Sequence, residues 1–380
     1  MRQQVFENYD VFDRERLTLH CVITTQTPLS HIGEVSGNVS NLKTLKLLDF
    51  EGNPRSVFTY SGNALRNGIL RRVGVAAALT ELGLQVNPDT HHTMFAGGRI
   101  DAGTASDMEL DKKIRVLMPW LSVLGTAKPA KVFGSKDAQM VQGRINVGSA
   151  YLVCYESAEY VYQQVPAILP PRSQPILEQL INAKDRLSSD PFTPSSEESI
   201  NFWESTKAKY LPLLRKELKT WTEFLAVDQT TRRDATLDPN LVKFLPTEVQ
   251  SKLKGDGTTK EKKSDQMIAS DRLIMPGAKL YSRWDLECTQ IEQGWIFDTL
   301  IKFAQFPYLG GKGNRGNGRV SMDFWFSSGT ERGLLWSSES GLESNKFSLA
   351  HAKYRDYLNQ YQQFLSEAKT STELRSLLGG

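Results

Sequence analysis

The chain has 380 residues, of which 39% are hydrophobic and 23% charged, a composition typical of a folded globular protein. No stretch approaches the roughly 20 apolar residues of a membrane helix, and the N-terminal segment lacks the apolar core of a signal peptide, so we expect a cytoplasmic protein. Three dispersed cysteines without a CxxC pair indicate reduced thiols, and the net charge of +3 favours a polyanionic partner only weakly.

Basic residues are concentrated in two segments that contain no acid. One lies between Glu51 and Glu81, and the other lies between Asp298 and Asp323. Their cations are Arg55, Arg66, Arg71, Arg72, Lys302, Lys312, Arg315 and Arg319. We hypothesise that the fold brings both segments onto one face that binds a polyanion.

The first predicted elements are a strand, a loop and a helix. Residues 17–24 alternate between apolar and polar side chains, which predicts a half-buried strand that ends before Pro28. The polar stretch 30–41 is expected to be a loop. Ser61 is a suitable N-cap for a helix whose apolar residues recur every four positions until Gly83 ends it.

Further along the chain, strands are predicted at residues 150–154 and 320–326, and helical periodicity dominates 174–227 and 346–368. Residues 251–266 have no apolar periodicity and are expected to form a projecting loop. Strands and helices in this order predict an α+β domain with long insertions.

A glycine-rich segment at residues 310–319 alternates glycine with lysine, arginine and asparagine. Its bare backbone can approach a phosphate closely, and each cation neutralises one phosphate charge. The match to GxGxxG does not indicate a dinucleotide site, because a strand follows it where a helix is required. No P-loop motif is present, and too little chain follows for a kinase. The alternative interpretation is a tight structural connection.

Four segments in order resemble the RAMP superfamily of CRISPR-associated proteins. Thr27 to Gly33 is similar to its first strand and HIG turn, and Tyr60 to Arg71 to its helix start. Leu124 to Thr126 with Gln142 to Ala150 resembles its third element, and Tyr308 to Val320 its signature glycine-rich loop. The chain length and the segment SHIGEVSGN resemble those of the backbone subunit of type IV effectors.

This resemblance implies a modified RRM or ferredoxin-like palm with a helical finger insertion and a thumb hairpin. The expected parts are palm at 1–83, fingers at 84–140, palm strand with a helical insertion at 141–228, thumb at 229–277, palm at 278–330 and a C-terminal helical packing segment at 331–380. It further implies a non-catalytic subunit that binds guide RNA without a metal or other cofactor. Such a subunit assembles head to tail with further copies of itself and joins other effector subunits. A helicase is a candidate further partner. The assembled subunits present the guide to target DNA or RNA.

Carried over by motif, the expected guide contacts come from the turn, the helix start and the glycine-rich loop, with two thumb residues placed by insertion position alone. They are Ser30, His31, Asn41, Ser61, Asn63, Arg66, Arg71, Lys312, Asn314, Arg315, Asn317, Arg319, Arg232 and Arg233. Some have plainer interpretations. His31 could be a hydrogen-bonded histidine at a strand end, and Arg71 could belong to the solvated face of an amphipathic helix.

Two enzymatic alternatives remain open. Related type III backbone subunits cut target RNA with an Asp after the HIG turn, but the position aligned with it here is Asn41, whose neutral amide is a poor Mg²⁺ ligand; Asp49 is a candidate if that alignment is shifted. The other alternative is a guide-processing endonuclease of the same superfamily, which relies on general acid and base residues.

Overall fold

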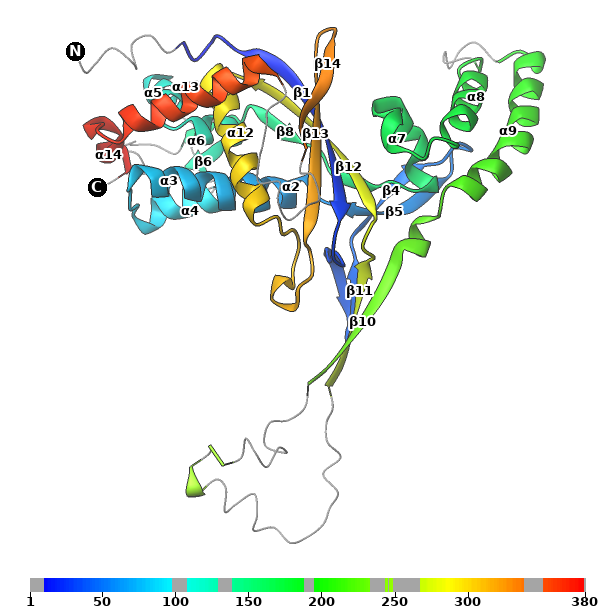
Figure 1. Ribbon diagram of the computed structural model, residues 1–380, viewed down its shortest axis with the longest axis horizontal. Helices are drawn as coiled ribbons and strands as arrows, with labels where there is room; N and C mark the ends of the chain where they lie inside the picture. Colours follow the sequence, from blue (N-terminus) through cyan, green and yellow to red (C-terminus); the bar gives the residue numbers. More distant parts are fainter. Residues whose placement is uncertain are drawn as a thin grey trace.

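The computed structural model describes residues 10–97, 108–128, 139–187, 195–232, 243–244, 246–248, 267–337 and 351–378. An eight-stranded antiparallel sheet forms the centre of the molecule, with helices on both of its faces, and a narrow second sheet projects from one end (Figure 1). Within these ranges, no helix combines the length and apolar character needed to cross a bilayer.

The central sheet has the connectivity of a ferredoxin-like palm. Its middle strands follow the order β13-β1-β12-β9, and β8 also pairs with β12. One helical segment follows β1 and another joins β12 to β13, which gives the βαββαβ pattern of that fold. The bounds are β1 Glu15–Thr25, β8 Ile145–Val147, β9 Ala150–Leu152, β12 Lys279–Cys288, α12 Gln290–Gln305 and β13 Val320–Ser328. The predicted α+β palm is therefore confirmed.

The predicted first helix is present and is continuous from Gly62 to Leu82. It comprises α2 Gly62–Leu65, a π-helical stretch η1 Arg66–Val75, and α3 Ala76–Leu82. Ser61 caps it by accepting a hydrogen bond from the Ala64 amide, and Gly83 ends it with φ +61°.

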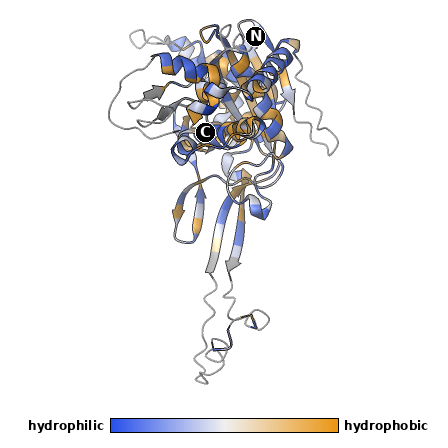
Figure 2. Ribbon diagram, turned by 90° about the vertical axis from the view of Figure 1, so that its left-hand side faces the viewer, coloured by the Kyte–Doolittle hydropathy of each residue, from blue (hydrophilic) through white to orange (hydrophobic). Residues whose placement is uncertain are grey.

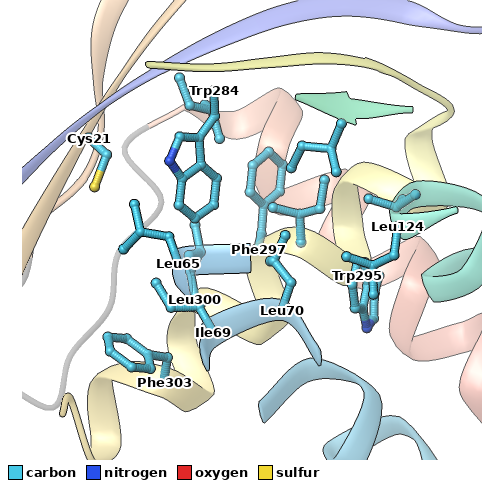
Figure 3. Packing of buried hydrophobic residues seen from close by; sticks show 14 of the residues in the cluster. Cys21, Leu65, Ile69, Leu70, Leu124, Trp284, Trp295, Phe297, Leu300 and Phe303 are labelled. Carbon is cyan, nitrogen blue, oxygen red and sulfur yellow. The ribbon is translucent and has the colours of Figure 1, made fainter. Parts of the chain in front are cut away.

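The main core lies between this helix, α12 and the inner face of the sheet. Alternate β1 residues, Leu19 and Cys21 among them, point into it, and Trp284 of β12 lies over Phe297 of α12 and Leu65 (Figure 3). Gly74 lets the two helices pack closely, because a Cβ there would collide with Thr299.

Two insertions extend this palm. One packs beside the first helix, and its described elements are α4 Pro88–Ala96, α5 Met108–Leu117, α6 Pro119–Leu124, β6 Thr126–Lys128 and β7 Gln139–Val141. A separate core between α7 Ala158–Gln164, α8 Gln174–Lys184 and α9 Glu197–Glu217 covers part of the opposite face of the sheet and contacts Val22 and Tyr281.

The projecting sheet has the order β10-β11-β3-β2, with bounds β2 Ile32–Ser36, β3 Val39–Leu42, β10 Leu225–Arg232 and β11 Met267–Ile274. Apolar residues gather in the body above it (Figure 2). The expectation of a loop at 30–41 was wrong: Gly37, with φ +57°, makes a tight β2–β3 turn, and β3 then pairs with β11. Residues 225–227 were expected to be helical and instead begin β10.

A further hairpin of β4 Thr44–Leu48 and β5 Pro54–Tyr60 adds to one edge of the central sheet. At the other edge, β14 Glu331–Ser337 pairs with β13, so the segment expected to be helical from residue 331 starts with a strand. Helices α13 Ala352–Ala368 and α14 Thr372–Leu378 follow, and α13 packs along α12.

Candidate nucleic-acid interface

The glycine-rich loop closes against two of the other sequence motifs. The Gly318 amide donates to the Pro28 carbonyl at 2.8 Å, and the Gly310 amide donates to Tyr60 Oη at the same distance. Gly310 has φ +79°, and a Cβ there would collide with the Ser30 carbonyl. The HIG turn, the helix start and the glycine-rich loop thus meet at one end of the central sheet.

His31 joins the turn to the helix start. The Ser61 amide donates to His31 Nε2 at 3.2 Å, and the imidazole stacks on Tyr60 with 4.3 Å between ring centres. Burial, with a further contribution from Lys43, lowers the pKa of His31 to about 4. The ring is therefore neutral at pH 7 and acts as an acceptor at the helix N-terminus, in agreement with the plainer interpretation of this residue.

The helix start also contacts the third motif. The Gly62 amide donates to Ser149 Oγ at 3.3 Å, and a Cβ on Gly62 would collide with the Val147 carbonyl. Asn63 is exposed in the first turn, where its Oδ1 accepts from the guanidinium of Arg66. Asn63 therefore lies at the surface of the helix start, and Arg66 is partly exposed.

The cations of the glycine-rich loop are not all free. Lys312 and Arg315 both pair with Asp271 of β11, and the Arg315 Nη1 to Asp271 Oδ2 distance is 3.2 Å. Burial alone would raise the pKa of Asp271, but hydrogen bonds from Lys312 and Ser40 hold it below its ordinary value. No acidic residue is close to this loop in the sequence, but the fold brings Asp271 of β11 against it.

Arg319 and Asn314 are exposed polar residues of the loop, and neither contacts Asp271 in the described structure. The Arg319 backbone is anchored, because its amide donates to Thr27 Oγ1 and its carbonyl accepts from the Gln26 amide. Its guanidinium makes no ion pair within the described part of the chain. Arg319 is thus a loop cation that no acid of the described residues neutralises.

Three of the expected contacts are buried, which corrects the sequence-based prediction. Arg71 is 2% exposed, because its guanidinium points into the insertion that contains α4 and α6, where it donates to the Met94 carbonyl at 2.6 Å and the Gly125 carbonyl at 3.2 Å. Asn317 is 7% exposed and Ser30 is 1% exposed, since both lie where the loop closes on the turn. None of the three side chains faces solvent.

Two arginines, Arg232 and Arg233, were expected on the thumb from insertion position alone. Arg232 is the last residue of β10, where it pairs with Met267 at the end of the projecting hairpin that is farther from the body. Arg233 lies outside the described residues.

Asn41 and Asp49 are the two residues considered in the ribonuclease alternative, and each lies in a β-hairpin. Asn41 lies in β3, opposite Glu34 of β2. Asp49 closes the β4–β5 hairpin, where it accepts from the amides of Glu51 and Asn53 and from Arg55 Nε at 2.8 Å. Across the described ranges, no three His, Cys, Asp or Glu side chains form a group that could hold a metal ion.

A separate cleft of about 770 Å³ lies near the N-terminal end of β1, away from the glycine-rich loop. Its arginines are largely neutralised: Arg14 pairs with Glu287, Arg115 with Asp111, and Arg144 with the buried Glu292. This cleft is therefore not part of the candidate interface.

Sequence reasoning missed Asp271 and the role of Tyr60. Asp271 stands in β11, about 40 residues before the loop it contacts, and nothing in the local pattern distinguishes it from a solvated acid. Tyr60 belongs to the helix-start motif, and its position before the N-cap was the available signal.

No family model matches the chain, and no curated protein matches it in sequence. Among solved structures, it is similar to a chain of a Type IV-B CRISPR Complex at 14% sequence identity and a TM-score of 0.43. The match covers 83% of this chain and 92% of that chain.

Proposed function

We propose that this protein binds the phosphate backbone of a guide RNA and serves as a non-catalytic backbone subunit of a multi-subunit CRISPR effector. The observation that carries the proposal is the convergence of the HIG turn, the helix start and the glycine-rich loop at one end of the sheet. These are the segments on which the sequence resembles the RAMP superfamily.

The chemistry of this surface suits phosphates. The exposed side chains of Asn63, Asn314, Arg315 and Arg319, with the partly exposed Arg66, offer hydrogen-bond donors and positive charge, and glycines keep the backbone accessible between them. Contacts of this kind hold the backbone of an RNA irrespective of its bases. Sequence information then comes from pairing between the guide and its target.

The proposal includes partners and a setting. One copy covers a short part of a guide, so we propose that copies associate head to tail along it, together with other effector subunits, with a helicase as a candidate further partner. The paired target is DNA or RNA, and the setting is the cytoplasm.

We propose that the chain itself does not cleave RNA. Metal-assisted cleavage requires carboxylates that hold a divalent ion beside the scissile phosphate. By motif, Asn41 with its neutral amide aligns with the carboxylate of the type III subunits, and the Asp49 carboxylate accepts hydrogen bonds within its own hairpin turn. Cleavage of a complementary RNA at regular intervals with Mg²⁺, abolished by Asp49→Ala, would refute this part of the proposal.

The RNA-binding proposal is tested with the double variant Arg315→Ala/Arg319→Ala. We expect weaker binding to every single-stranded RNA alike, and a salt slope reduced by about 0.7 for each phosphate that the variant no longer neutralises. The matched control is Lys209→Ala/Lys216→Ala, which removes two exposed charges from α9, far from the loop (Figure 1). Equal affinity of the folded loop variant and the wild type would contradict the proposal.

A further inference from the structure

The carboxylate of Asp271 lies where three parts of the chain meet. β11 carries it, β3 pairs beside it at Ser40, and Lys312 and Arg315 of the glycine-rich loop reach it. The Asp271 side chain is 5% exposed, whereas those of Lys312 and Arg315 are 19% and 35% exposed. The carboxylate thus lies beneath the two cations, and a phosphate arriving from solvent meets the cations first.

Lys312 is held in a backbone conformation that a lysine rarely adopts. Its φ is 68°, the one positive φ of a non-glycine residue in the described ranges. Such a conformation costs free energy and persists where surrounding contacts hold it. The ion pair with Asp271 is a contact that does so.

We infer that Asp271 is a positioning residue, which fixes Lys312 and Arg315 in the arrangement that receives RNA phosphates and ties the glycine-rich loop to the projecting sheet. The inference rests on the proposed function. Arg315 contacts Asp271 through Nη1, so its other donors remain for a phosphate. Two long side chains fixed before binding lose less conformational freedom when RNA arrives.

Simple electrostatics predicts the opposite effect. Asp271 cancels one positive charge near the loop, so a purely electrostatic role implies that its neutralisation tightens RNA binding. A positioning role implies that the same substitution weakens binding, although the net charge becomes more positive. The sign of the change distinguishes the two roles.

The test compares Asp271→Asn with Glu34→Gln in the full-length protein. Glu34 is exposed on β2, so its substitution adds the same unit of charge at the same end of the molecule without touching the loop. Fluorescence anisotropy with a labelled, unstructured single-stranded RNA is measured at several salt concentrations. We expect affinity about tenfold weaker for Asp271→Asn, and unchanged or tighter binding for Glu34→Gln.

A double-mutant cycle separates positioning from a general loss of structure. In a Lys312→Ala/Arg315→Ala background, Asp271→Asn should change the affinity no further, because no cations remain to be positioned. Should Asp271→Asn fold poorly, Asp271→Glu keeps the charge, displaces the carboxylate by one methylene and should also weaken binding.

Unchanged or tighter binding by Asp271→Asn would overturn the inference, as would an equal loss in the background without the two cations. If neither the wild type nor Glu34→Gln binds RNA, the proposed function itself is wrong.

Discussion

His31 has a neutral imidazole that the fold uses as a hydrogen-bond acceptor at the start of the first helix. With a folded pKa of about 4 and an unfolded pKa of about 6.5, the unfolded chain binds more protons between these values. His31 therefore contributes stability in full above pH 6.5 and loses it as the pH falls towards 4. We expect about 1–2 kcal/mol to be lost over that range, given the partial exposure of the ring.

The measurement is the free energy of unfolding by urea at pH 4.5 and pH 7.0 for the wild type and His31→Gln. The variant should show a smaller difference between the two pH values, since an amide does not titrate there. His92, exposed on α4, is the control position, and His92→Gln should keep the wild-type difference. An identical pH dependence in His31→Gln would show that the ring does not remain neutral.

Arg71 is buried and its neighbour Arg72 is exposed, so the two arginines allow a matched comparison of stability. Arg71→Met removes a buried guanidinium and leaves the carbonyls of Met94 and Gly125 without their donor, so we expect a loss of about 2–4 kcal/mol in the free energy of unfolding. Arg72→Ala removes an exposed side chain and should change stability by about 0.5 kcal/mol or less. Equal stability of the two variants would contradict the structural role of Arg71.

The sequence indicates which side chains could bind a phosphate. It does not indicate which of them are buried or paired within the folded protein. Ser61 was identifiable as an N-cap, because the cap acts locally. Arg71 was predicted to contact the guide, with a solvated helix face as the alternative, because the insertion that buries it comes later in the chain and leaves no local mark. Asp271 was missed for the same reason.

The glycine-rich loop is an element whose glycines have unequal roles. Gly310 has positive φ and faces the Ser30 carbonyl, whereas Gly311 has open space around it. We expect Gly310→Ala to destabilise the protein by about 2 kcal/mol or more, because both the backbone conformation and the close approach oppose a methyl group. Gly311→Ala should be nearly neutral.

Thermal unfolding of both alanine variants tests this difference, and RNA affinity adds a second measurement. Gly310→Ala should also weaken RNA binding, since the loop cannot close against the HIG turn. Comparable unfolding temperatures for the two variants would show that the loop does not dock as described.

The strands and the first helix with strong periodicity were predictable, and the added hairpins were not. β13 and most of β1 alternate because the sheet face toward α12 is fully buried, whereas the opposite face is only partly covered. β2 is exposed along its whole length, so it carries no alternating pattern and its sequence predicts a loop. Its pairing depends on β3, which in turn pairs with β11 from a distant part of the chain.

For the whole molecule, the proposal predicts assembly on RNA. Purified protein mixed with guides of increasing length should give complexes whose mass rises in steps of one protein copy, because head-to-tail contacts build open helices. Native mass spectrometry counts the copies. Replacing residues 231–268, most of the expected thumb, by a short turn retains Asp271 and should leave a protein that folds but protects RNA without regular spacing. Regular footprints after that deletion would contradict the thumb assignment.

The central pairing of β1 with β12 also constrains how the chain can fold as it is made. Cys21 lies opposite Ser282, so β1 leaves the ribosome about 260 residues before the strand that completes its sheet. At about 5–20 residues per second, that interval lasts roughly 13–50 s. Until β12 and β13 arrive, both edges of β1 lack their partner strands and its apolar face lacks α12. Synthesis in the cell therefore exposes an aggregation-prone strand for a long interval, and we expect the yield of folded protein to depend on chaperones that bind nascent chains.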